Sequence, residues 1–131
     1  MLYRTTGEVP VEMIGELSAA TALIYFSAYI LAVVVGHLFV RFILQRYPLP
    51  KEGGLKGAGA MIGILERIFT LTLVLVGQYM ALGLILTAKS IARFEDLKDR
   101  KFAEYYLIGT LSSMLFAVFI GIFTLWVVKI V

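Results

Sequence analysis

The sequence predicts an all-α integral membrane protein with four helical segments, two long spans and a central helical hairpin, in a single domain over residues 1–131. Two observations predict this class. Hydrophobic residues make up 60% of the chain and charged residues only 16%, and a soluble domain of this size could not bury so much apolar surface. The charged residues are also segregated, which leaves apolar stretches of about 20 residues, enough for a helix to cross about 30 Å of hydrocarbon.

The first span is expected over about residues 17–40. It follows Pro10 and several acidic residues, and it ends where Arg41 opens a polar stretch that contains Pro48 and Pro50. Because proline lacks the backbone N–H that a helix interior needs, this pair predicts that the helix has stopped. The first segment is therefore expected to be a complete crossing.

The last span is expected over about residues 104–128. Trp126 and Lys129 lie near its end, where aromatic and basic side chains anchor helices at the membrane interface. Polar loops are expected at residues 45–57 and 95–103. The two loops bracket the central part of the chain.

The central residues 58–94 allow two interpretations. As one helix they would be about 55 Å long at 1.5 Å per residue, too long for one crossing unless the ends protrude. As a hairpin they would turn at Gly77 and Gln78, where a glycine and an amide interrupt the apolar run. Lys and Arg flank this region on both sides, and these residues concentrate in short cytoplasmic loops. We therefore favour the hairpin, which places both loops in the cytoplasm, with three transmembrane helices as the alternative.

The hairpin register brings charged residues together. With the turn between positions 77 and 78, Glu66 faces Lys89 and Arg93 lies near Ile62. An ionised side chain at bilayer depth costs about 2.5 to 3.5 kcal/mol on insertion scales and requires a partner. We expect a roughly charge-balanced network of Glu66, Lys89, Arg93 and Glu104, which is favoured as a structural lock over an ion or proton pathway. In the three-helix alternative, Glu66 and Lys89 would lie at opposite interfaces.

Small residues recur at helical spacing and predict close helix packing. In lipid no hydrophobic force drives helices together, so they associate through small residues and hydrogen bonds. Packing within one chain is favoured over a dedicated oligomer face, yet a bundle this thin is also expected to associate with itself or with other membrane subunits. The candidate packing residues are Gly59, Gly63, Gly109, Ser113, Ala117 and Gly121, and a weaker stripe comprises Ala28, Ala32 and Gly36.

Several classes of site are excluded or not expected. The chain has no cysteine, which excludes disulfides and thiolate metal sites. His37 is the only histidine, which excludes a histidine-pair metal site within one chain. No G-K-[ST] follows the glycines of residues 53–59, so no phosphate loop is expected, and the net charge of +3 is too small to predict nucleic-acid binding. We expect no catalytic residue, no cofactor, no metal and no enzymatic activity.

Four motifs carry a resemblance to a known family. They are I-G-I-L-E-R at residues 62–67, G-Q at 77–78, A-K-S-I-A-R-F at 88–94 and A-E-Y-Y-L-I-G-T at 103–110. About half of the chain resembles the C-terminal part of a bacterial and archaeal polytopic membrane family described only as a domain of unknown function. The resemblance implies a prokaryotic cytoplasmic membrane and supplies no activity. It also implies an intramembrane polar network at the matching positions Glu66, Arg67, Gln78, Lys89, Ser90, Arg93, Glu104 and Tyr105.

The sequence thus favours a small membrane subunit that assembles into a homo-oligomer or a larger membrane complex, with the lipid bilayer as its surroundings. The alternative is a channel, a transporter or a pore-forming effector that uses the same polar residues as a pathway. An enzyme acting on lipid is the least supported class.

Overall fold

A computed structural model describes residues 11–48, 55 and 57–130, and all regular elements among them are helical. The first long helix consists of α2 (Val11–Ile30), the π-helix η1 (Leu31–Val35) and α3 (Gly36–Leu44). The hairpin consists of α4 (Ala58–Leu75), the short 3₁₀ helix η2 (Tyr79–Ala81) and α5 (Leu82–Ala92). A second 3₁₀ helix, η3 (Asp96–Lys98), precedes α6 (Arg100–Ile130).

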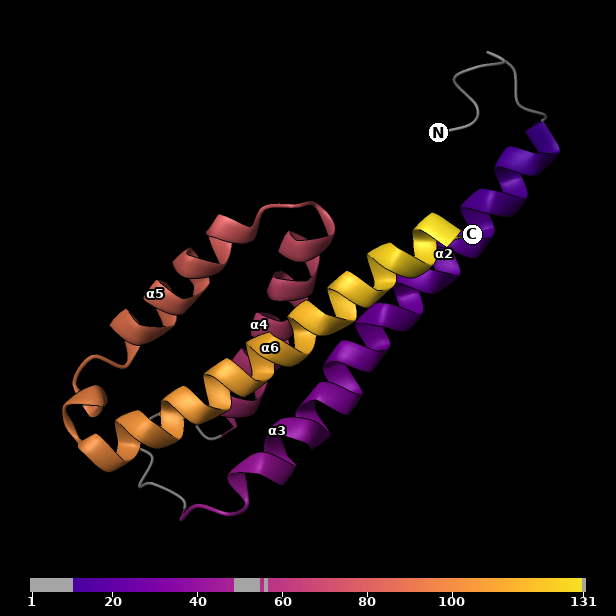
Figure 1. Ribbon diagram of the computed structural model, residues 1–131. Coiled ribbons are helices and arrows are strands. Elements are labelled where there is room, and N and C mark those ends of the chain that lie inside the picture. The colour runs from indigo at the N-terminus through magenta and orange to yellow at the C-terminus, as the bar shows by residue number, and fades with distance from the viewer. Residues whose placement is uncertain (1–10, 49–54, 56, 131) are drawn as a thin grey trace.

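The helices run alternately up and down, as Figure 1 shows. The end of α3, the start of α4, the end of α5 and the start of α6 all lie at one end of the bundle. The start of α2 and the end of α6 point the other way. The all-α class with a central helical hairpin is therefore confirmed, and residues 58–94 form two legs instead of one helix.

The hairpin turns where the sequence predicted it. Gly77 has a φ of 76°, a left-handed conformation that glycine adopts without steric cost. Its N–H donates to the carbonyl of Val74 at 3.1 Å, and the Gln78 N–H donates to the carbonyl of Leu73 at 2.8 Å. These two bonds are the Schellman motif, which satisfies the last carbonyls of a helix and stops it.

The helices extend beyond the ranges expected for the spans. α2 begins at Val11 and α3 ends at Leu44, whereas the span was expected over residues 17–40. α6 begins at Arg100, within the loop expected at residues 95–103, and continues to Ile130. Hydropathy marks where a helix is in hydrocarbon, whereas polar residues can continue the same helix outside it. Most of the loop expected at residues 45–57 lies outside the described residues.

The core combines small residues with Leu71 and Val74 and lies between α4, α6 and the first long helix. Ala117 and Gly121 of α6 are buried, and a Cβ added at Gly121 would lie only 2.6 Å from Val74 Cγ1 of α4. Ala28 and Ala32 are buried in the same way and cluster with Leu71. The small residues of α6 and of the first long helix therefore pack within the chain. At Gly63 an added Cβ would meet only the Arg67 side chain of the same helix. Gly59 differs, because it is exposed near the start of α4.

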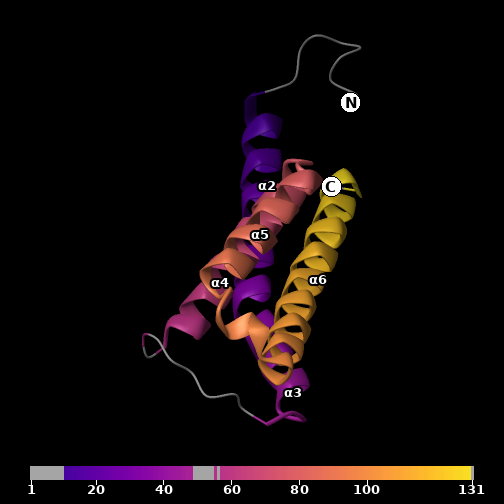
Figure 2. The ribbon, with the colours of Figure 1, turned by 90° about the vertical axis from the view of Figure 1, so that its left-hand side faces the viewer.

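Hydrogen bonds and aromatic contacts add to this core. The hydroxyls of Tyr29 and Thr72 lie 2.5 Å apart and join α2 to α4. The rings of Phe39 and Phe116 stack with centroids 5.3 Å apart and join α3 to α6. The remaining helix, α5, lies on the outside of this bundle, beside α4 and α6, as Figure 2 shows.

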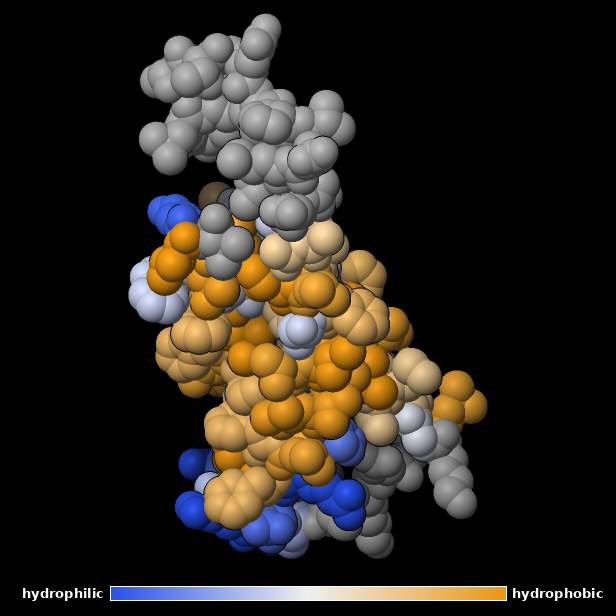
Figure 3. All heavy atoms as spheres, turned by 90° about the vertical axis from the view of Figure 1, so that its right-hand side faces the viewer, coloured by the Kyte–Doolittle hydropathy of each residue, from blue (hydrophilic) through white to orange (hydrophobic). Residues whose placement is uncertain are grey.

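The surface fits a lipid environment. Three helices are long and apolar enough to cross a membrane, at residues 19–44, 58–75 and 100–130, and a shorter apolar helix covers residues 79–92. Figure 3 shows a broad hydrophobic belt, with hydrophilic residues gathered beneath it at one end. α4 is about 27 Å long at 1.5 Å per residue, and the residue 79–92 segment only about 21 Å. The second leg of the hairpin is thus short of the full hydrocarbon thickness.

Candidate functional site

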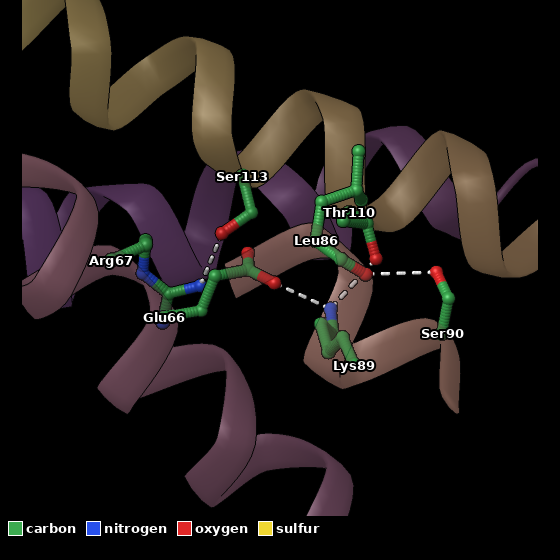
Figure 4. Close-up of polar contacts among 7 residues, drawn as sticks. All are labelled: Glu66, Arg67, Leu86, Lys89, Ser90, Thr110 and Ser113. Carbon is green, nitrogen blue, oxygen red and sulfur yellow. Dashed lines mark hydrogen bonds and ion pairs between the residues drawn. The ribbon is translucent and has the colours of Figure 1, made fainter. Parts of the chain in front are cut away.

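The most unusual feature of the bundle is a buried ion pair. Lys89 Nζ of α5 lies 2.5 Å from Glu66 Oε2 of α4, and it donates a second hydrogen bond to Thr110 Oγ1 of α6 at 2.7 Å. Glu66 is 3% exposed. One ammonium group thereby joins three helices, as Figure 4 shows. The predicted pairing of Glu66 with Lys89 is confirmed.

Arg67, the next residue on α4, is also buried and is 2% exposed. Its side chain reaches α6, where Nη1 donates to Ser113 Oγ at 3.2 Å (Figure 4). It also reaches the first long helix, where Nη2 donates to the Val33 carbonyl at 3.5 Å. Both acceptors are neutral. Among the described residues, Arg67 Nε and Glu66 Oε1 have no hydrogen-bond partner.

The first long helix changes form where Arg67 meets it. η1 is a π-helix of five residues, and the Gly36 N–H that follows it bonds to the carbonyl of Leu31, five residues earlier. A Cβ added at Gly36 would lie 2.7 Å from Arg67 Cδ. Single π-turns within α-helices often occur at functional sites. Here the irregular turn and the missing side chain leave room for a buried arginine.

A large cavity opens beside these residues, at the end of the bundle that carries the loops. Its volume is about 1050 Å³, and it lies between α3, α4, α5 and α6. Its lining combines charged residues with aromatic, aliphatic and small ones. The charged residues in its lining are Arg41, Glu66, Arg67, Lys89 and Arg93, and His37 is also part of it.

The other residues of the expected polar network lie in different places. Arg93 and Tyr105 line the cavity with Glu66, Arg67 and Lys89. Ser90 lies on α5, where its hydroxyl donates to the Leu86 carbonyl at 2.8 Å (Figure 4). Gln78 is exposed at the hairpin turn, away from the ion pair.

Glu104 is not part of the network, contrary to the expectation. Its side chain is 61% exposed and accepts a hydrogen bond from Arg100 Nε at 2.8 Å. The reason is that α6 already begins at Arg100, which places the two residues one helical turn apart on the surface. The acid expected to balance Arg93 is therefore absent from the cavity.

Three residues near the ion pair were missed as members of the site. Thr110 was not among the residues expected in the polar network, yet its hydroxyl accepts a hydrogen bond from Lys89. The Tyr106 ring lies with its centroid 5.0 Å from Lys89 Nζ, and the Phe102 ring 5.8 Å from Arg93 Cζ. Aromatic faces attract such cations. The spacing of Phe102, Tyr106 and Thr110 at intervals of four residues was the signal that could have identified them.

The described residues contain no group of three or more His, Asp or Glu side chains that could hold a metal ion. Comparisons with protein-family models, with curated proteins and with solved structures find no match to this chain. The resemblance to a polytopic family of unknown function therefore stays a prediction. The structure is that of a small multi-span membrane protein with a buried Glu66–Lys89 salt bridge.

Proposed function

We propose that the chain is a small membrane subunit that assembles into a homo-oligomer or a larger membrane complex, with the Glu66–Lys89 pair as its structural lock. The observation that carries the proposal is the position of Lys89 Nζ, which bonds Glu66 of α4 and Thr110 of α6 together. The proposal assigns no catalytic role to these residues.

The lock matters because α5 has little else to hold it. None of the residues Leu82–Ala92 is buried, and apolar contacts between helices gain little over contacts with lipid tails. A charged hydrogen bond that is shielded from water contributes more than a neutral one. Lys89 thus attaches the second hairpin leg to both α4 and α6.

Assembly is supported by the surface of the same leg. A shallow hollow of about 380 Å³ lies along α5 and continues to η3, and its lining includes Leu86, Thr87, Ser90 and Ile91. Thr87 and Ser90 are small polar residues, which membrane helices use at close contacts. A second copy or another subunit that covered this side would bury α5 between two bundles.

The second candidate function is a channel, a transporter or a pore-forming effector. It is favoured by the cavity, which carries several charged side chains into the bundle. A pathway needs these groups to be exchangeable, whereas a lock needs them to stay paired. The two functions therefore differ in what the loss of the Glu66 charge would do.

The substitution Glu66→Gln separates these functions. Loss of the assembled state, measured by light scattering in detergent, with no ion flux in liposomes before or after the change, supports the structural role. Changed ion flux in an intact assembly supports the pathway. Glu95→Gln is the matched control, because Glu95 pairs with Lys98 on the exposed surface. An unaltered assembly and unaltered flux in the Glu66 variant would contradict both functions.

The location is part of the proposal. We place the protein in a prokaryotic cytoplasmic membrane as a multi-pass protein, with the loops at residues 45–57 and 95–103 in the cytoplasm. The support is that basic residues gather where α3 ends and α6 begins, which is the same end of the bundle. Arg41 lies in the last turn of α3 and Arg46 just after it, whereas Lys98 ends η3 and Arg100 and Lys101 begin α6. Such basic residues favour the cytoplasmic side.

A further inference from the structure

The cavity beside the ion pair has an excess of positive charge. Four cations line it, Arg41, Arg67, Lys89 and Arg93, and Glu66 is the one acid among the described lining residues. With His37 neutral, four positive charges and one negative charge leave a net charge of +3. Because Glu104 lies on the surface with Arg100, it does not reduce this excess.

The carboxylate of Glu66, the one acid among the described residues of this lining, already has a partner. Glu66 Oε2 is paired with Lys89, and none of the three arginines forms an ion pair with any other described residue. Of the three arginines, Arg67 has the greatest need of a negative partner, since it is buried and its hydrogen bonds go only to the neutral oxygens of Ser113 and Val33. Its acidic neighbour Glu66 is shared with Lys89, and a buried cation that is only partly compensated is unfavourable. The cavity therefore has the chemistry to bind an anion.

Part of the remaining lining is apolar. Ile62, Leu65 and Phe69 of α4 and Ile85 of α5 line the same cavity, and the first three are exposed on the surface of the bundle. The cations of α3 and the end of α5 lie toward the loops, whereas Phe69 and Ile85 lie toward the hairpin turn. An occupant that fits both parts carries an anionic group at one end and a hydrocarbon chain at the other.

We propose that this cavity binds an anionic phospholipid, with the phosphate among Arg41, Arg67 and Arg93 and an acyl chain along Leu65, Phe69 and Ile85. Guanidinium groups bind phosphate oxygens through paired, charge-assisted hydrogen bonds. Basic pockets between membrane helices recognise lipid headgroups in this way. The volume of about 1050 Å³ lies just above the range of about 300 to 1,000 Å³ for ligand cavities. This inference goes beyond the proposed assembly and does not depend on it.

Native mass spectrometry of the full chain, stripped of lipid in detergent, tests the proposal. The three additions are a short-chain phosphatidylglycerol, the matching phosphatidylcholine and inorganic phosphate. We expect one phosphatidylglycerol per chain, bound about tenfold or more tightly than phosphatidylcholine, because zwitterionic headgroups offer no net negative charge. Equal binding of the two lipids would overturn the proposal. Inorganic phosphate binding as tightly as phosphatidylglycerol would assign the cavity to a soluble phosphate and also overturn it.

The paired substitution Arg41→Gln and Arg93→Gln locates the site. Neither residue is buried, so the bundle is expected to fold, and phosphatidylglycerol binding is expected to weaken about tenfold or more through the loss of charged hydrogen bonds. Arg46→Gln is the control, because Arg46 lies at the same end of the bundle with its guanidinium over the Phe42 ring, outside the cavity lining. Equal weakening in the control, or no weakening in the paired variant, would overturn the assignment. The same spectra report the number of chains per particle, so failure of lipid binding is distinguishable from failure of assembly.

Discussion

Gly36 of α3 lies directly against the side chain of Arg67 of α4. A Cβ added at Gly36 would approach Arg67 Cδ to 2.7 Å and Arg67 Nε to 3.1 Å, and it would also meet the Phe116 ring at 3.2 Å. Since the π-helix ends immediately before Gly36, the irregular turn and the missing side chain occur together. The buried arginine is thus accommodated by the helix opposite it, and this relation can be tested at Gly36.

The substitution Gly36→Ala is expected to destabilise the protein by about 1 to 3 kcal/mol, the usual cost of overpacking a filled interior. The measurement is the midpoint of unfolding when sodium dodecyl sulfate is titrated into detergent micelles. Gly83→Ala is the matched control, because Gly83 lies in α5 with nothing within 4 Å of an added Cβ. The control is expected to be neutral or stabilising, since alanine favours helix over glycine. Equal midpoints for the two variants would show that Gly36 is not needed for close approach.

The contact between α4 and α6 at Gly121 supports a second prediction. An added Cβ there would lie 2.6 Å from Val74 Cγ1 and 3.0 Å from Val74 Cβ. Because Val74 Cβ is fixed to the backbone of α4, Gly121→Ala forces the helices apart and is expected to cost about 1 to 3 kcal/mol in the same titration. Val74→Ala removes the clashing methyl groups. In the double variant the two losses of stability should partly cancel. A loss equal to the sum of the two single losses would contradict this contact.

The ion pair supports a third prediction. Removing one partner of a buried pair leaves the other charge uncompensated, which costs about 3 to 5 kcal/mol. Glu66→Gln and Lys89→Met are each expected to destabilise the protein in this range, whereas the double variant should lose clearly less than the sum. The exposed pair Arg100 and Glu104 is the control, because surface pairs one turn apart contribute only about 0.3 to 0.5 kcal/mol. Additive losses at Glu66 and Lys89 would show that the two charges do not interact.

The hairpin and its ion pair were predictable from the sequence because both depend on local chemistry and on register. Gly77 interrupts an apolar run, and a turn there places position 66 opposite position 89 by counting alone. Glu104 was misassigned because the start of α6 lies in polar sequence, where hydropathy does not mark a helix end. The π-helix at Leu31–Val35 was not predicted either, since those five residues are apolar and suit a regular helix equally well. It lies against Arg67 of another helix, a contact that no local pattern contains.

The arrangement of both loops at one end of the bundle can be tested by labelling single cysteines, since the natural chain has none. Tyr47 and Asp99 are exposed at the loop end, and Lys129 is exposed at the other end. A membrane-impermeant maleimide is expected to reach Tyr47→Cys and Asp99→Cys only in inverted vesicles, and Lys129→Cys only in intact spheroplasts. Labelling of Tyr47→Cys and Asp99→Cys from opposite faces would contradict the hairpin. Labelling of both from the outer face would agree with the hairpin and contradict the cytoplasmic location. The experiment therefore tests the fold and its orientation separately.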